Sequence, residues 1–507
     1  MLKYKNTFFK SLSFSYLYIS VYLVTGLLTT PMLLNHFQAD YFALLMLIYG
    51  VITYLNNIRF GLPESLAVLL AKSKDAVFNA YMVKKNFFIL CLIVVFTLIL
   101  LSVAGMIIHD WRIVLGDVYT LNKEDVLNVF YIFIIFALIK IPFDISLVTF
   151  IGFHEVYLEK FYKIINPLVN FTLVVFVVYA DKNIVFFAFW AGFLDLLVSL
   201  VSFIHIYIRY DLIKVRDTTQ KIDSIDLLKS GMLFFQLSLT QTLIWGVGIF
   251  LVSHILSLEY VTIYSLNMKI YIYILYAYII VNTVIAPLYG RYFADNSWKD
   301  IERIFNLMLL LLPFLGGFIW IGTLYFMSDI IALWTGSQEF YIGSLFVLLM
   351  GSFFYFTGYV NSYITLLYSI GEIKSIIEIQ WKEVMVNIVV SSISIYTIGL
   401  SGLALGMFLA IFLISTRYLP KCIENTAKGK ITLNFKIQKK HFLLVLIPNV
   451  LVAFIVTNFI DSLLLKSAFF TAASFLYILF SWTMLPPKYK VSMMALLNYK
   501  ERELIEK

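Results

Sequence analysis

Lys269 has the most unusual chemical setting in the sequence, because it lies within an apolar stretch long enough to span a membrane. An ammonium group is costly at that depth, so such a lysine needs a counter-charge, water or a bound anion. On a helical period, hydroxyl side chains share its face: Thr262, Ser265, Tyr273 and Tyr276. This polar stripe predicts one wall of a hydrated cavity, with these residues as candidate substrate-binding groups. The alternative is a lysine that extends to the outer membrane interface.

A second polar stripe lies on the first apolar stretch, where Tyr22 and Thr25 share a helix face. We consider these two residues as further cavity-lining candidates. Hydroxyl side chains also serve as hydrogen-bonding contacts between helices in lipid, and this structural interpretation carries equal weight.

Charged residues in two further spans are candidates for ion coupling. Lys140 and Asp144 stand four residues apart around Pro142, so they can pair on one helix face beside a break in the backbone ladder. Lys140 is also a candidate substrate contact. Asp195 has no partner nearby in the sequence, so we expect it to be protonated, paired with another helix or facing water. The spacing leaves open a structural ion pair or a proton site.

A polar segment closes the second span and is a candidate inner gate. Its members are Asn56, Asn57, Arg59 and Glu64. An arginine at this depth is also a common interface anchor. In a later span, Glu378, Lys382 and Glu383 can pair locally, and we interpret them as a solvated helix end.

Composition restricts the class of protein. The chain has 507 residues, of which 61% are hydrophobic and 13% charged, and its mean hydropathy is +0.90. These values indicate an all-α, polytopic membrane protein. The two cysteines form no disulfide framework or metal motif, and the six histidines lie near span ends. Nucleotide-binding loops and nucleophile motifs are missing from the sequence. We therefore expect a carrier with no cofactor and no metal, not an enzyme.

Apolar periodicity predicts about fourteen transmembrane helices. The expected spans are 11–34, 41–58, 83–108, 126–149, 161–178, 184–208, 228–255, 261–285, 304–327, 341–365, 376–396, 402–416, 441–460 and 463–484. Most of the 38 lysines and arginines fall in the termini and in every second loop, which predicts that both termini are cytoplasmic. The net charge of +8 therefore reflects topology, and no nucleic-acid partner is expected.

A weak internal repeat suggests two lobes. The loop after the first span and the loop at 253–260 each contain a histidine followed by an acid–tyrosine pair. We expect a six-helix lobe over 1–210, a second over 211–425, and two additional helices with a tail over 426–507. An even number of spans per lobe relates the lobes by a pseudo-two-fold axis along the membrane normal.

The chain resembles the Wzx-type polysaccharide flippases, which share a superfamily with lipid II flippases and MATE exporters. The resemblance rests on the segments TGLLTTPMLLNHF and YFALLMLIYGVITYLNNIRFGLPESLA of the first hairpin, and on DLLKSGMLFFQLSLTQ and SLEYVTIYSLNMKI. Two departures are the missing glycine before Tyr41 and the presence of Arg59 where an acid often stands.

The resemblance implies alternating access around a central cavity in the bacterial inner membrane. The implied substrate is an undecaprenyl-pyrophosphate-linked oligosaccharide for O antigen, capsule or another surface polymer, moved with an ion gradient. Implied partners are membrane lipids, a polysaccharide polymerase and a chain-length regulator. Three alternatives stay open: a MATE-like exporter of small molecules, an integral-membrane glycosyltransferase or polymerase, and a non-transporting lipid scramblase or assembly scaffold.

Overall fold

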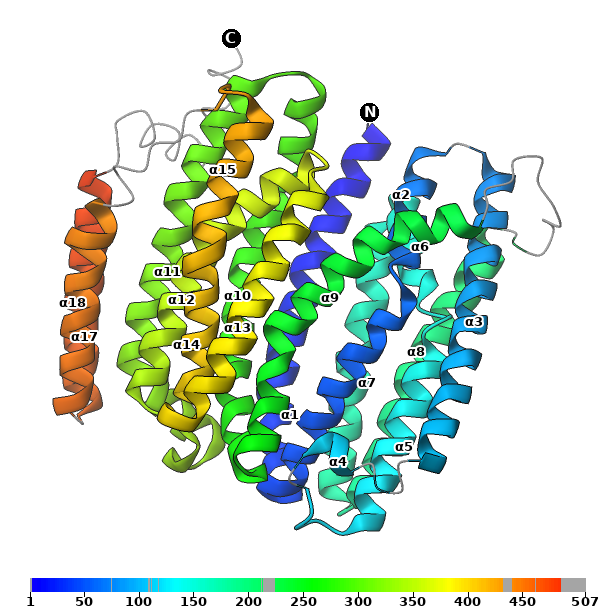
Figure 1. Cartoon of the computed structure of the whole chain (residues 1–507), viewed down its shortest axis with the longest axis horizontal. Coiled ribbons are helices and arrows are strands. Elements are labelled where there is room, and N and C mark those ends of the chain that lie inside the picture. The colour runs from blue at the N-terminus through cyan, green and yellow to red at the C-terminus, as the bar shows by residue number, and fades with distance from the viewer. Residues whose placement is uncertain are drawn as a thin grey trace. The chain divides into compact units, whose positions relative to one another are not determined.

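The computed structural model describes residues 2–73, 75–107, 110, 112–116, 118–210, 212, 224–431, 440–460 and 462–484. These residues are almost entirely helical and contain no strand (Figure 1). Twelve helices among them are long and apolar enough to cross a membrane. One of these, Lys10–Arg59, contains two crossings, and α13 (Ile373–Ile398) has spanning length but a charged first half. The predicted all-α polytopic fold is confirmed, with a helix count close to the expected number.

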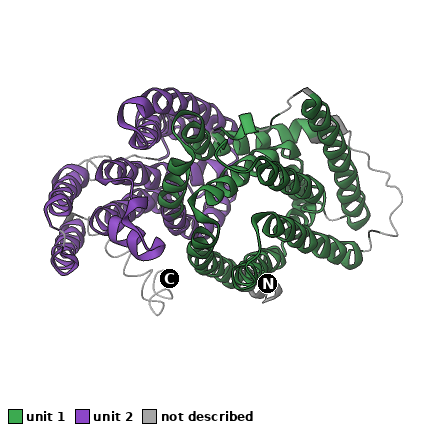
Figure 2. Cartoon of the chain, turned by 90° about the horizontal axis from the view of Figure 1, so that it is seen from below, with its two compact units in different colours: residues 1–269 green, residues 270–507 purple. Residues whose placement is uncertain are grey.

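The chain divides into two compact units, 1–269 and 270–507 (Figure 2). The helices that begin in unit 1 are α1 (Leu2–Leu55), η1 (Asn56–Arg59), α2 (Leu62–Lys72), α3 (Ala76–Ile107), α4 (Arg112–Leu115), α5 (Lys123–Lys140), α6 (Ile145–Gly152), α7 (Val156–Tyr179), α8 (Ile184–Arg209), α9 (Ser224–Ile255) and α10 (Leu258–Ala294). Helix α10 crosses the boundary between the units.

The first hairpin is formed by α1, which reverses direction at Gln38 (Figure 1). Gln38 has φ 64° and ψ 171°, a conformation that interrupts the helix. The returning half ends in η1, and Phe60 and Gly61 then both adopt left-handed conformations before α2 begins. Gly61 is required here, because a Cβ atom on it would lie 2.1 Å from the carbonyl oxygen of Gly231 in α9. The backbones of the α1–α2 connection and α9 are therefore in direct contact.

A break in the fourth span separates α5 from α6. Pro142 has no N–H to donate, and residues 141–144 form turns in place of continuous helix. The amides of Phe143 and Asp144 both donate to the Lys140 carbonyl oxygen, at 2.9 and 3.2 Å. The break therefore places Lys140 and Asp144 on either side of a turn within the apolar region, where both side chains turn toward α8.

Unit 2 contains the rest of α10 and the helices α11 (Trp298–Thr335), η2 (Gln338–Phe340), α12 (Ser344–Ser369), α13, α14 (Ser401–Ala410), the π-helix η3 (Ile411–Ser415), α15 (Thr416–Ala427), the π-helix η4 (Phe442–Leu446), α17 (Ile447–Phe459) and α18 (Leu463–Met484). The last helix is fastened to α11 at two levels. Lys466 pairs with Asp329 at 3.1 Å, and the buried Tyr477 hydroxyl donates to the Phe314 carbonyl oxygen at 3.0 Å.

Several helices are longer than the sequence predicts. Helices α10 and α11 contain 37 and 38 residues, because both continue well beyond the apolar stretch. The expected short span at 402–416 is the first part of a continuous helical segment from Ser401 to Ala427, which α15 extends beyond the predicted end. Helix α9 packs against α1, α2 and η1 and belongs to unit 1. The lobe division at 1–210, 211–425 and 426–507 stays a prediction.

Candidate functional site

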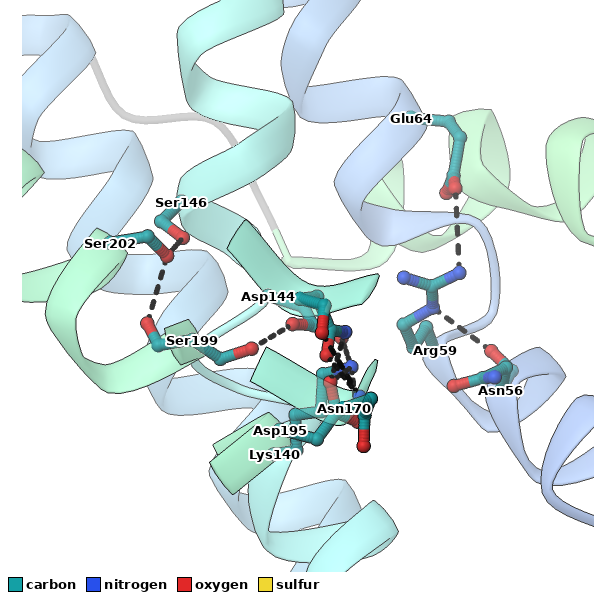
Figure 3. A network of polar contacts seen from close by, with 11 residues as sticks. Asn56, Arg59, Glu64, Lys140, Asp144, Ser146, Asn170, Asp195, Ser199 and Ser202 are labelled. Carbon is teal, nitrogen blue, oxygen red and sulfur yellow. Dashed lines mark hydrogen bonds and ion pairs between the residues drawn. The ribbon is translucent and has the colours of Figure 1, made fainter. Parts of the chain in front are cut away.

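A charged cluster lies inside unit 1, where α5, α7 and α8 meet (Figure 3). The Lys140 ammonium, at the end of α5, donates to both carboxylate oxygens of Asp195 in α8, at 2.9 and 2.8 Å. Asn166 of α7 donates to the same carboxylate at 2.5 Å, and Asn170 donates to the Asn166 side-chain oxygen at 2.8 Å. Asp195 is therefore paired with another helix, one of the outcomes that the sequence left open.

Asp144 completes this cluster from the α5–α6 turn. Its Oδ2 lies 3.8 Å from the Lys140 Nζ, and its Oδ1 accepts a hydrogen bond from Ser199 at 2.7 Å. The predicted pair of Lys140 and Asp144 therefore exists, but Asp195 is the closer partner of the lysine. Counted at their formal charges, one ammonium and two carboxylates sum to −1. A group of this kind within a membrane span can hold an additional proton or cation.

Helix α8 positions the cluster through a polar stripe that begins at Asp195. Its members share one face and each contacts another segment: Asp195 with Lys140, Ser199 with Asp144, Ser202 with Ser146, His205 with Tyr162, and Arg209 with Glu155. The half of α8 before Asp195 carries only apolar, aromatic and glycine residues. Because unpaired polar groups are costly in lipid, these contacts fix the rotation of α8 against its neighbours.

A second buried charge group, which sequence reasoning missed, lies at the start of α7. The side chain of Glu159 is 1% exposed and pairs with Lys160 at 3.1 Å and with Lys163 at 2.6 Å. The Lys160 ammonium also lies 5.6 Å from the centre of the Tyr18 ring in α1. The signal in the sequence is the spacing of Glu159 and Lys163, which places both on one helix face.

The structure brings three of the four inner-gate candidates together (Figure 3). The Arg59 Nε donates to the Asn56 carbonyl oxygen at 2.9 Å, and Arg59 lies 4.0 Å from Glu64. Asn57 is buried and instead donates to Thr242 of α9 at 3.1 Å. These contacts join the end of α1 to α2 and α9. Their role as a gate stays a prediction.

Lys269 lies in unit 1 and donates to the Thr30 hydroxyl of α1 at 2.5 Å. It is about three turns, or ~16 Å, from the start of α10. Thr30 is fully buried, about two turns before the Gln38 kink. The Lys269 ammonium therefore contacts a side chain of α1 well inside that helix and not at its end. Among the described residues, no carboxylate forms an ion pair with it.

The other stripe residues have different surroundings. Thr262 is fully buried and donates to the Ala39 carbonyl oxygen at 2.6 Å, which is a packing contact with the first hairpin. The Ser265 hydroxyl is buried without a hydrogen-bond partner among the described residues. Tyr273 and Tyr276 follow in the part of α10 that belongs to unit 2, and both are half-buried.

The two substrate-contact candidates in α1, Thr25 and Tyr22, also have different surroundings. Thr25 is buried and donates to the Val21 carbonyl oxygen of its own helix at 2.7 Å. Tyr22 is half-buried, with its ring centre 6.1 Å from that of Tyr18. The Thr25 hydroxyl therefore bonds within its own helix and not to another helix, while substrate contact by either residue stays a prediction.

The burial of Glu383 contradicts one interpretation of the sequence. We expected it to belong to a solvated helix end, but in α13 it is 6% exposed and accepts a hydrogen bond from Ser415 of the π-helix η3. Lys382 does not pair with it and instead places its ammonium 4.4 Å from the Tyr418 ring centre. The local charge pattern suggested solvent, whereas packing against η3 decides the burial.

The described residues include no group of three or more His, Cys, Asp or Glu side chains that could hold a metal ion.

No protein-family model and no curated protein match the sequence. Solved structures do match the fold. The lipid II flippase MurJ in an inward closed conformation has a TM-score of 0.64 at 16% identity, with 100% of both chains covered.

Two further structures support the same fold. A multidrug resistance MATE family transporter of the MOP superfamily, in an inward-facing conformation, has a TM-score of 0.61 at 13% identity, covering 81% of this chain and 96% of that one. A MOP superfamily transporter from Pyrococcus furiosus, described by the reverse polarity of its binding pocket, has a TM-score of 0.60 at 14% identity, covering 84% and 96%. The fold is therefore the one found in MOP superfamily transporters.

Proposed function

We propose that this protein is a flippase that moves a lipid-linked oligosaccharide, joined to its lipid through a pyrophosphate, across the bacterial inner membrane. Alternating access would carry the polar head through the protein while the polyprenyl tail stays in lipid. Both the lipid II flippase and the exporters with this fold are transporters, which supports a carrier over an enzyme. The undecaprenyl carrier and its use in O-antigen or capsule assembly belong to this proposal.

The observation that carries the proposal is the setting of Lys269. Its ammonium lies deep in a membrane span and is held by one neutral hydroxyl, with no carboxylate partner among the described residues. A charged lysine at the centre of a span costs about 2.5–3.5 kcal/mol in insertion measurements. Retaining that cost is reasonable if a substrate supplies the missing negative charge. A pyrophosphate does so, whereas a cationic drug would be repelled.

The sugar and the driving force have candidate groups as well. The half-buried tyrosines Tyr22, Tyr273 and Tyr276 offer ring faces and hydroxyls to a carbohydrate. Asp144 and Asp195, with their net negative charge after pairing with Lys140, are the candidates for coupling to an ion gradient.

Charge variants of Lys269 test this function. Lys269→Arg should retain part of the transport, while Lys269→Gln and Lys269→Glu should lose it, Glu most completely. The measurement is surface polymer together with lipid-linked intermediate, in a strain that lacks its own flippase and carries each variant at matched membrane level. Lipid-linked repeat units should then accumulate on the cytoplasmic leaflet.

Lys182 provides a matched control, because its side chain is exposed in the connection between α7 and α8. Lys182→Glu should leave polymer production unchanged. Normal polymer from Lys269→Glu would show that this lysine is only an anchor. Export of small cations by the wild type, without movement of lipid-linked sugars, would favour the MATE-like alternative.

A further inference from the structure

The cluster around Lys140 has the ligands of a monovalent-cation site, but one of its own side chains supplies the cation. Two carboxylates, Asp144 and Asp195, converge on one point within unit 1. Such hard oxygen ligands attract alkali and alkaline-earth cations. The Lys140 Nζ occupies that point, 2.8 and 2.9 Å from the two oxygens of Asp195. An ammonium carries the same single charge as Na⁺.

We propose that Lys140 acts as a tethered cation that excludes Na⁺ from the carboxylates of unit 1, so that this site exchanges protons and not sodium. The inference rests on the proposed function in one respect, since it specifies which ion can couple to transport at these residues. It assigns Lys140 a role in ion selectivity that is separate from substrate contact.

The covalent attachment of Lys140 to its helix favours its ammonium over a free Na⁺ at this site. A free Na⁺ must lose hydration and translational freedom to bind, whereas the lysine is already held at the site by its own helix. The remaining contacts favour the lysine as well. Asn166 donates its N–H to Asp195 and turns its oxygen toward Asn170, so this amide offers no oxygen to a metal in the cluster. Ser199 donates its proton to Asp144 in the same way.

Proton binding to the carboxylates does not require displacement of Lys140. It needs one carboxylate oxygen and no coordination shell, and the cluster has one carboxylate more than it has ammonium groups. Adding one proton to Asp144 or Asp195 would make the cluster neutral while Lys140 stays in place. Among the described residues, Arg59, Lys163 and Tyr49 also face these three side chains electrostatically.

The test is Na⁺ binding by purified full-length protein in nanodiscs, which requires no substrate. Retention of ²²Na⁺ is measured by scintillation proximity, and thermal unfolding is followed while NaCl replaces choline chloride at constant ionic strength. Wild type should show no saturable retention and no Na⁺-dependent change in Tm. Lys140→Ala and Lys140→Gln should gain saturable retention and a Tm that rises with Na⁺. Adding Asp195→Asn to Lys140→Ala should remove both gains.

Lys160→Ala is the matched control, because it also removes a half-buried lysine from an ion pair in unit 1 but leaves Glu159 paired with Lys163. It should not gain Na⁺ binding. Saturable Na⁺ retention by wild type that Asp195→Asn abolishes would overturn the proposal, whether or not the Lys140 variants fold. Monodisperse Lys140→Ala and Lys140→Gln proteins that retain no Na⁺ would overturn it too. Either result would leave the flippase function standing, since that function is tested by polymer production.

Discussion

The relative strength of the two ion pairs of Lys140 gives a quantitative prediction. At an effective dielectric constant of about 20, the Coulomb energy is ~6 kcal/mol for the Asp195 contact at 2.8 Å and ~4.4 kcal/mol for the Asp144 contact at 3.8 Å. Only the Asp195 contact includes charge-assisted hydrogen bonds. Desolvation lowers both net values, but the ammonium is common to both pairs. The Asp195 side chain is 32% exposed and that of Asp144 12%, so solvent screens the closer pair more, and the coupling to Asp195 should exceed that to Asp144 by at most about 1.5 kcal/mol.

Double-mutant cycles measure this difference. The free energy of unfolding is obtained by SDS titration in mixed micelles without Na⁺, for Lys140→Met, Asp195→Ala, Asp144→Ala and the two double variants. Lys140→Met alone should cost about 2–3 kcal/mol, below the loss for a fully buried pair, because it leaves the buried Asp144 and the half-buried Asp195 without their cation. Lys140→Met with Asp195→Ala should recover part of that loss. Equal couplings, or a larger coupling to Asp144, would refute the assignment of Asp195 as the principal partner.

A third cycle serves as the control. Glu155 pairs with Arg209, which lies ~21 Å along α8 from Asp195. The effects of Lys140→Met and Glu155→Ala on the free energy of unfolding should therefore add within about 0.5 kcal/mol. A coupling comparable to that of Lys140 with Asp195 would show that the measurement reports a general loosening of unit 1 and not a specific ion pair.

Two predictions concern backbone and loop contacts. Gly61→Ala should lower the free energy of unfolding by more than about 2 kcal/mol, because the new methyl group meets an α9 carbonyl oxygen. Gly336→Ala, at a similar positive φ but in open space, should lower it by only about 1 kcal/mol. Equal losses in SDS titrations would contradict the steric argument. In the described part of the loop after α3, hydrogen bonds from Arg112 lower the pKa of the Asp110 carboxyl from 3.8 to about 2. This contact should therefore persist at neutral pH, weaken only as the pH falls toward 2, and slow hydrogen exchange of α4; exchange unchanged by Asp110→Asn at pH 7 would contradict it.

The sequence alone predicts the membrane class and most spans, because hydropathy over a bilayer thickness is a strong and local signal. It also predicts that Lys140 and Asp144 approach each other, since four residues on a helix bring side chains together. The closer partner, Asp195, lies on a different helix, and no local rule connects it with Lys140. Glu383 shows the opposite error, because its charged neighbours suggested solvent while tertiary packing against a π-helix buries it.

The cations of unit 1 differ in which groups lie close to them. Lys140, Lys163 and Arg59 each have a carboxylate within 4.0 Å. These cations lie on helices of one compact unit, where the fold itself can supply the opposite charge. Lys269 has a hydroxyl in that position. Among the described residues of unit 1, these three cations therefore have a carboxylate close by, whereas Lys269 has only a neutral partner. The proposed function accounts for this difference, because an anionic head group would supply the opposite charge to Lys269 during transport.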